Sequence, residues 1–132
     1  MINEIHLQTK KHAEMIDITA QVQNLLTNQN VQEGLVVVFS SHTTAGITIN
    51  ENADPDVQRD FLRRLDEIYP RDNDKDRYGE GNSAAHLKAS TVGASQTVIV
   101  HKGELLLGRW QGIYFCEFDG PRTRSCFLKT IS

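Results

Sequence analysis

Side chains that can do chemistry gather in three parts of this sequence. These parts combine histidines, carboxylates, hydroxyls and arginines, and they are residues 41–44 with 50–51, residues 80–83 with 86, and residues 110–112 with 117, 122 and 124. A hydrophobic core rarely selects such residues, because charged and amide side chains are costly to bury unless they are paired. Each part is therefore a candidate for a functional site.

The residue types suggest distinct roles within such a site. His42 and His86 can transfer protons or ligate a metal near neutral pH. Glu51, Asp60 and Glu117 can act as bases or hold a divalent cation. We take these five residues as the candidate catalytic groups. The two histidines are also the candidate ligands of a divalent metal, zinc or magnesium.

The other polar side chains favour an anionic ligand. Arg122 and Arg124 offer forked N–H donors that match phosphate or carboxylate. A helix start expected after residue 81 adds free backbone N–H groups, which also attract anions. The candidate substrate-binding residues are Thr43, Thr44, Asn82, Lys88, Gln111, Arg122 and Arg124. Together they predict a phosphorylated or otherwise anionic small molecule as the ligand.

Each of these residues also has a purely structural explanation. His42 can satisfy the backbone of a turn, His86 can lie on a helix surface, and Glu117 can pair with an arginine across a hairpin. The sequence contains no His-Glu-x-x-His or Cys-x-x-Cys metal motif, no P-loop, no dinucleotide fingerprint and no serine hydrolase elbow. Spacing alone therefore identifies no reaction.

Composition argues against several classes of protein. The chain has 132 residues, enough for one domain, residues 1–132, with its own core. Its net charge is -3, and its 14 basic residues form no stripe that could follow a phosphate backbone, so nucleic acid is not an expected partner. No apolar run reaches the roughly 20 residues of a membrane-spanning helix, and residues 1–4 do not resemble the start of a secretory signal. We expect a cytoplasmic protein with no membrane partner.

Hydrophobic periodicity predicts the elements that position the site. Residues 34–40 form a continuous apolar run typical of a central strand covered on both faces, and residues 46–51 alternate as a half-exposed strand. His42 then lies in the connection between them. Asp54 and Pro55 predict the start of a helix that ends before residue 70.

The remaining segments complete a β-rich α+β domain. We expect a strand over residues 5–7, a helix around residues 19–26, a long exposed loop over 71–81, a short helix over 84–88, and strands over 97–101, 104–107, 108–118 and 124–130. The expected fold is a single compact domain in which antiparallel or mixed sheets form a sandwich or a barrel-like structure. Two main helices and one short helix accompany the sheets.

The relative position of the two cysteines depends on how the last two strands pair. If these strands form a hairpin about Pro121, Cys116 and Cys126 fall opposite one another, since their numbers average to 121. Such an arrangement would permit a redox pair. In a reducing compartment we expect buried thiols that act as small apolar residues.

Longer blocks of sequence resemble a known family. The blocks are residues 42–46, 50–52, 54–57, 80–82, 85–88, 108–113 and 117–122, which begin His-Thr-Thr-Ala-Gly and end Glu-Phe-Asp-Gly-Pro-Arg. Their order and composition resemble the YjbQ-like family, often labelled secondary thiamine-phosphate synthase, over almost the entire chain. The resemblance implies a homotrimer of α+β subunits with a polar pocket near the subunit contacts.

The resemblance also implies an activity. This is a weak thiamine-phosphate synthase reaction, which joins hydroxymethylpyrimidine diphosphate to thiazole phosphate and releases diphosphate. One departure concerns residues 76–79, where many members carry a further histidine and this chain has Asp-Arg-Tyr-Gly. Three functional hypotheses remain: such a transferase, a trimeric ligand-binding, metal-binding or scaffold protein without catalysis, and a metal-dependent phosphohydrolase.

Overall fold

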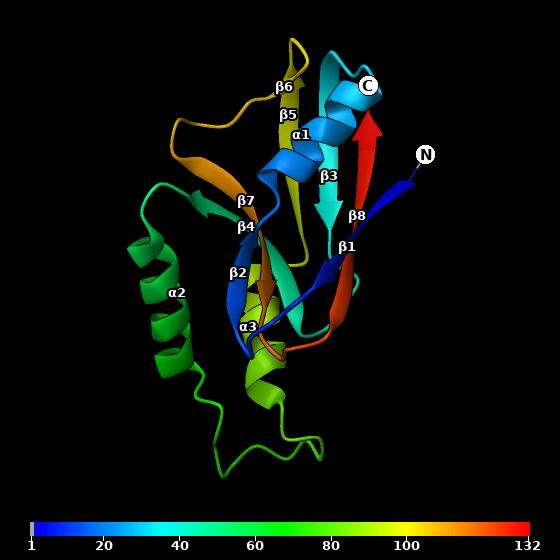
Figure 1. The fold of residues 1–132 in the computed structure, drawn as a ribbon. Coiled ribbons are helices and arrows are strands. Elements are labelled where there is room, and N and C mark those ends of the chain that lie inside the picture. The colour runs from blue at the N-terminus through cyan, green and yellow to red at the C-terminus, as the bar shows by residue number, and fades with distance from the viewer. Residues whose placement is uncertain (1) are drawn as a thin grey trace.

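Two antiparallel sheets and three helices form the fold in the computed structural model, which describes residues 2–132. The elements are β1 (Ile2–Gln8), β2 (Glu14–Asp17), α1 (Thr19–Asn28), β3 (Glu33–Phe39), β4 (Ala45–Glu51), α2 (Pro55–Ile68), α3 (Ser83–Val92), β5 (Ser95–His101), β6 (Glu104–Leu105), β7 (Gln111–Glu117) and β8 (Thr123–Ile131). One sheet has the strand order β1-β8-β3-β5-β6, and the other has the order β2-β7-β4. Figure 1 shows α1 across the large sheet, with α2 and α3 at the small sheet. The expected α+β domain with sheet-on-sheet packing is confirmed.

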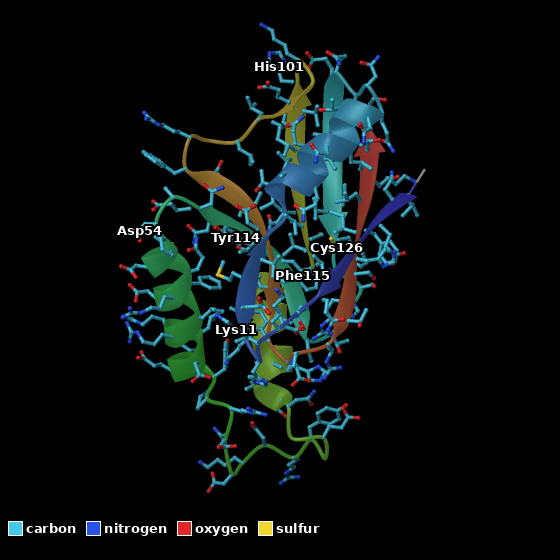
Figure 2. All side chains as sticks on the ribbon, viewed as in Figure 1. Lys11, Asp54, His101, Tyr114, Phe115 and Cys126 are labelled. Atoms are coloured by element: carbon cyan, nitrogen blue, oxygen red, sulfur yellow. The ribbon has the colours of Figure 1, made fainter. Side chains whose placement is uncertain are left out.

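The main core fills the space between the two sheets and α1. Val22 and Leu26 of α1 and Val36 and Val38 of β3 are fully buried there, and Phe115 of β7 lies at the centre of the molecule (Figure 2). A second apolar cluster covers the opposite face of the small sheet, where α2 and α3 pack. The small sheet is therefore covered on both faces.

This arrangement corrects the expectation for residues 34–40. Only one face of β3 is buried, and on the other face Leu35 and Phe39 remain 37% and 42% exposed. The strand covered on both faces is β7, which is buried from its second residue to its last. A continuous apolar run indicates a strand that is buried on both faces. It does not indicate whether the segment that covers the second face belongs to the same chain.

The hairpin predicted around Pro121 is wrong. β7 pairs with β2 and β4 in the small sheet, whereas β8 pairs with β1 and β3 in the large one. Cys116 lies opposite Met15 and Gly46, and Cys126 lies opposite Ile5. Both cysteines are buried free thiols in different clusters, as expected for small apolar residues. Burial raises the pKa of the Cys116 thiol to about 12, so it stays protonated.

Local signals place α2 correctly. The carboxylate of Asp54 accepts a hydrogen bond from the Asp56 N–H at 2.9 Å, and Pro55 occupies the first helical position. The third helix is longer than the expected residues 84–88, and it runs from Ser83 to Val92. Within residues 2–132, no helix has the length and apolar character needed to cross a bilayer.

A glycine lets α3 approach the small sheet. A Cβ atom on Gly46 would lie only 2.7 Å from the carbonyl oxygen of Gly93, just past the end of α3. That same carbonyl accepts the N–H of Ile47 at 3.0 Å. The close contact fixes α3 beside β4, and so it brings the side chains at the start of α3 to the β3–β4 connection.

Candidate functional site

A pocket of about 320 Å³ lies where the β3–β4 connection, the start of α3 and the β7–β8 connection meet. Seven of the predicted site residues line it, and these are His42, Thr43, Thr44, Asn82, His86, Arg122 and Arg124. Ser41, Tyr78 and Glu80 complete its wall. Residues that are far apart in the sequence therefore line one polar pocket.

A buried ion pair forms the base of this site. Glu117, at the end of β7, is fully buried, and Arg124, at the start of β8, is 4% exposed. The Nε of Arg124 donates to Oε1 of Glu117 at 2.9 Å, and its Nη2 donates to Oε2. Oε1 also accepts the hydroxyl of Thr9 at 2.8 Å, and Oε2 accepts the N–H of Asp119 at 3.0 Å.

The ion pair determines the charge state of Glu117. Burial alone would raise the pKa of this carboxyl, because it disfavours the charged form. Hydrogen bonds from Arg124, the Asp119 N–H and the Thr9 hydroxyl oppose that effect, and the pKa of Glu117 is lowered from its usual value. Glu117 is therefore a carboxylate with both oxygens occupied, placed to hold Arg124.

The guanidinium of Arg124 has one nitrogen left for a ligand. Its Nη2 also donates to the hydroxyl of Thr44 at 2.7 Å, which completes the fixed side of the group. Among residues 2–132, Nη1 has no protein partner and is not enclosed, and Arg124 lines the pocket. The sequence placed Arg124 among the anion-binding residues, and this geometry gives it a fixed N–H donor for that role.

His42 is a neutral donor in this arrangement. Its Nε2 accepts the backbone N–H of Ser125 at 3.1 Å, so in the neutral ring the proton lies on Nδ1. Burial lowers the pKa of His42, and the positive charge of Arg124 lowers it further. The edge contact with Phe115, at 6.4 Å between ring centroids, helps to hold the ring. The Nδ1–H of His42 is therefore available to donate a hydrogen bond to a ligand, whereas the lone pair on Nε2 is already used by Ser125.

Stability should fall in mild acid because of His42. Its folded-state pKa is lowered below the ordinary 6.5, so the unfolded chain binds more protons as the pH falls through 6.5. The stabilisation from neutral His42 is present above that pH and is lost as the pH drops through the folded-state value. We expect denaturant unfolding at pH 7 and pH 5 to show this loss in the native protein and a smaller loss in His42→Gln. Equal losses would contradict the assignment.

His86 differs from His42 because its ring nitrogens have no hydrogen-bond partner among residues 2–132. It lies half-buried on α3, and its ring meets the ring of Tyr78 edge-on, with centroids 5.3 Å apart and an interplanar angle of 82°. The contact orients the imidazole at the pocket wall. A free ring nitrogen in a pocket is what a proton-transferring group requires.

Asn82 links the two ends of the site. It is the N-cap residue of α3, but its side chain makes no capping bond. Instead its Nδ2 donates to Oδ2 of Asp119 at 2.9 Å, and the same oxygen accepts Nη2 of Arg122 at 2.7 Å. Oδ1 of Asn82 is buried and has no partner, so it is a ready acceptor for a ligand N–H or O–H.

The structure does not bring four of the predicted residues to this pocket, namely Glu51, Asp60, Lys88 and Gln111. In the β4–β7 register Ala45 lies opposite Glu117, whereas Glu51 lies opposite Gln111 at the other end of the sheet. Six residues of strand separate the two ends, a distance of about 20 Å. Asp60 is exposed on α2, 3.9 Å from Arg63. Within one chain, these carboxylates are thus remote from His42 and His86.

The predicted metal site lacks a complete ligand set in the described chain. No group of three or more His, Cys, Asp or Glu side chains within residues 2–132 is placed to hold an ion. The Nε2 of His42 is also occupied by the Ser125 N–H. The residues in this arrangement do not fit a shared ion, and the divalent metal at His42 and His86 stays a prediction.

Sequence reasoning missed several members of the site. Thr9 donates its hydroxyl to Glu117 from 108 positions away, and the same oxygen accepts the backbone N–H of Arg122 at 2.9 Å. No local pattern marks this residue. Tyr78 and Glu80 stand in the long loop expected over residues 71–81, and the available signal was that such loops often carry function.

Comparison with known proteins identifies the family. The profile described as UPF0047 protein YjbQ-like matches residues 3–132. The chain belongs to this family. The YjbQ-like chain is 59% identical to UPF0047 protein YugU of Bacillus subtilis over 99% of both chains, and 47% identical to UPF0047 protein MJ1081 of Methanocaldococcus jannaschii over 99% of this chain and 94% of that one.

Solved structures of YjbQ-like proteins share the fold closely. An uncharacterized conserved protein of the YjbQ/UPF0047 family from Clostridium acetobutylicum gives a TM-score of 0.95 at 53% identity, covering 98% of this chain and 99% of that one. A YjbQ-like protein of unknown function from Sulfolobus solfataricus gives 0.93 at 30% identity, covering 98% and 95%. A family member that is only 30% identical to this chain therefore still has the same fold.

Proposed function

We propose that this YjbQ-family protein is an enzyme that acts on phosphorylated small molecules. The observation that carries the proposal is the fixed Nη1 of Arg124, held by Glu117 and Thr44 at the pocket that His42 also lines. Arg122 adds a second guanidinium to the same wall. Preorganised donors of this kind stabilise a phosphate without the cost of ordering them when the ligand binds.

The roles within this proposal follow from hydrogen bonding. Arg124, Arg122 and the Nδ1–H of His42 hold a phosphate, because all three present donors and no acceptor. His86 transfers a proton, because its ring nitrogens are unengaged among residues 2–132. The buried Oδ1 of Asn82 accepts a hydrogen bond from the substrate and helps to orient it.

The resemblance supplies the specific reaction that we propose to test first. Hydroxymethylpyrimidine diphosphate would be joined to thiazole phosphate with release of diphosphate. The arginines would stabilise the negative charge that develops on the departing diphosphate.

The test measures turnover and metal content on the same preparation. The protein is incubated with the two thiamine precursors, with and without magnesium or zinc, and in parallel with generic phosphate esters in water. Formation of thiamine phosphate supports the transferase, and release of phosphate from simple esters supports the phosphohydrolase instead. Stabilisation by phosphate in a thermal-shift experiment, with no turnover of any compound, would favour a binding protein over an enzyme.

We also propose that the protein assembles with itself, as the homotrimer that the resemblance implies. The exposed face of the large sheet supports this. In the strand register Leu35 lies between Ile99 and Ile131, and Phe39 lies opposite Phe127, so apolar side chains form a continuous group on that face. Ile99 and Ile131 are 54% and 51% exposed. Apolar surface of this kind commonly marks an interface.

Charge on that face should therefore disrupt the assembly. We expect Ile99→Lys to shift the protein from a mass near three times 14.9 kDa toward smaller species in light scattering coupled to size-exclusion chromatography. Ile68→Lys is the matched control, because Ile68 is 64% exposed on α2, away from the sheet face. A native protein of one-chain mass, or equal effects of the two variants, would refute the proposed interface.

A further inference from the structure

A second cavity adjoins the pocket that contains His42 and His86. Its volume is about 240 Å³, and Glu80, Asn82 and Arg122 line both spaces. The Asp119 carboxylate, which accepts hydrogen bonds from Asn82 and Arg122, also lines this second cavity. Arg122 and Asn82 thus stand between two neighbouring spaces, of which the proposed function uses one.

Basic side chains from four separate segments converge on the second cavity. His12 comes from the β1–β2 connection, Arg71 from the loop after α2, Lys88 from α3 and Arg122 from the β7–β8 connection. Arg71 makes no ion pair among residues 2–132. The wall of this cavity therefore holds more basic side chains than carboxylates.

Lys88 is the most buried of the basic residues that line this cavity. Its side chain is 7% exposed, and its ammonium has one acceptor, Oδ1 of Asp66 at 2.9 Å. Asp66 itself is 62% exposed and does not line the cavity. An ammonium has three N–H donors, and a buried charge with a single partner is poorly satisfied. The cavity is where the other donors can find an acceptor.

The acidic groups nearby do not meet this need. Asp119 already accepts hydrogen bonds from Asn82 and Arg122. Glu80 remains as the other carboxylate of the wall. The first turn of α3 adds free backbone N–H groups beside the cavity, because the side chain of Asn82 does not cap the helix. Donors therefore exceed acceptors in this space.

We propose that this cavity is a second anion-binding subsite, and that the ligand carries two anionic groups, phosphate or carboxylate, one in each cavity. Arg122 lies in the wall of both spaces and contacts the ligand between its two anionic ends. The inference rests on the proposed function for the first anionic group only. Lys88, Arg71 and the start of α3 bind the second group.

Nuclear magnetic resonance separates the two subsites. Inorganic phosphate is titrated into the native protein while the backbone amide signals are followed. The second subsite predicts shifts for Ala84 and Ala85 at the start of α3, and the first predicts shifts for Thr43 and Thr44. Shifts at Thr43 and Thr44 alone overturn the second subsite and leave the proposed function standing. Shifts at Ala84 and Ala85 alone support the second subsite and count against the first.

Two variants then distinguish ligand binding from a structural ion pair. Ethylenediphosphonate should bind the native protein more tightly than ethylphosphonate, and Lys88→Met should remove about tenfold of that advantage in calorimetry. Asp66→Asn breaks the same ion pair but keeps the ammonium, so it should preserve or strengthen binding. If both variants weaken binding equally, or neither does, Lys88 serves only the α2–α3 contact and the proposal is overturned.

Discussion

Replacing Glu117 by Gln should lower the free energy of unfolding by about 3–5 kcal/mol, measured by urea denaturation at pH 7. The amide keeps the size of the side chain but removes its charge, and it leaves the guanidinium of Arg124 buried without a counter-ion. Arg124 is 4% exposed, so water that reaches Nη1 from the pocket does not replace the carboxylate at Nε and Nη2. A loss of this size is a large share of the 5–15 kcal/mol that stabilises a typical domain.

An exposed pair provides the control for this prediction. Glu67 accepts a hydrogen bond from Arg63 at 2.6 Å on the surface of α2, where both side chains are more than half exposed. Glu67→Gln should change the free energy of unfolding by less than about 1 kcal/mol. If the two substitutions have similar effects, the buried pair does not have the importance that we assign to it.

Removing both charges tests the same pair in another way. A Glu117→Leu and Arg124→Met double variant leaves no uncompensated ion, so it should be more stable than Glu117→Gln although it carries two changes.

Low pH should destabilise the protein in the same way as Glu117→Gln does, because it also removes the charge of Glu117. The pKa of Glu117 is lowered in the folded state, so its contribution is present above 4.5 and is lost as the pH falls through the lower folded-state value.

The parts of this structure that sequence predicted depend on local chemistry. Asp54 and Pro55 define the start of α2 through a capping bond and a fixed backbone angle, both within three residues. Arg122 and Arg124 were grouped because their types suit an anionic ligand, and both line the pocket. Local signals and side-chain chemistry are enough for predictions of this kind.

The errors have a common physical cause in long-range pairing. The turn signal at residues 119–121 is the same whether the chain folds back as a hairpin or crosses from one sheet to the other. β8 pairs with β1, where Leu7 lies opposite Arg124, more than a hundred positions away, and no local pattern encodes that choice. Long-range pairing also places Glu51 at the far end of β4 from the His42 pocket, and it brings Thr9 to the buried carboxylate of Glu117.

The largest effect on activity is expected at His86. His86→Gln should reduce turnover of the phosphorylated substrate by about 100- to 10,000-fold, because the amide cannot carry a proton through the reaction. The binding constant of the substrate should change little, since Arg122, Arg124 and His42 are the residues that we propose to hold its phosphate. The measurement compares single-turnover rates with calorimetric binding constants for the same variant.

His42→Gln is the matched substitution, and it should show the opposite pattern. Gln can still accept the Ser125 N–H, so the backbone contact at 3.1 Å has a replacement. The loss of the Nδ1–H should weaken phosphate binding by about three- to tenfold while the rate at saturation falls less than in His86→Gln. If the two variants lose rate equally and keep their affinity, both histidines act in the chemical step, and the division between a neutral donor and a proton carrier is wrong. If neither variant loses rate, neither histidine takes part in the chemical step, and the catalytic role that we propose for this pocket is wrong.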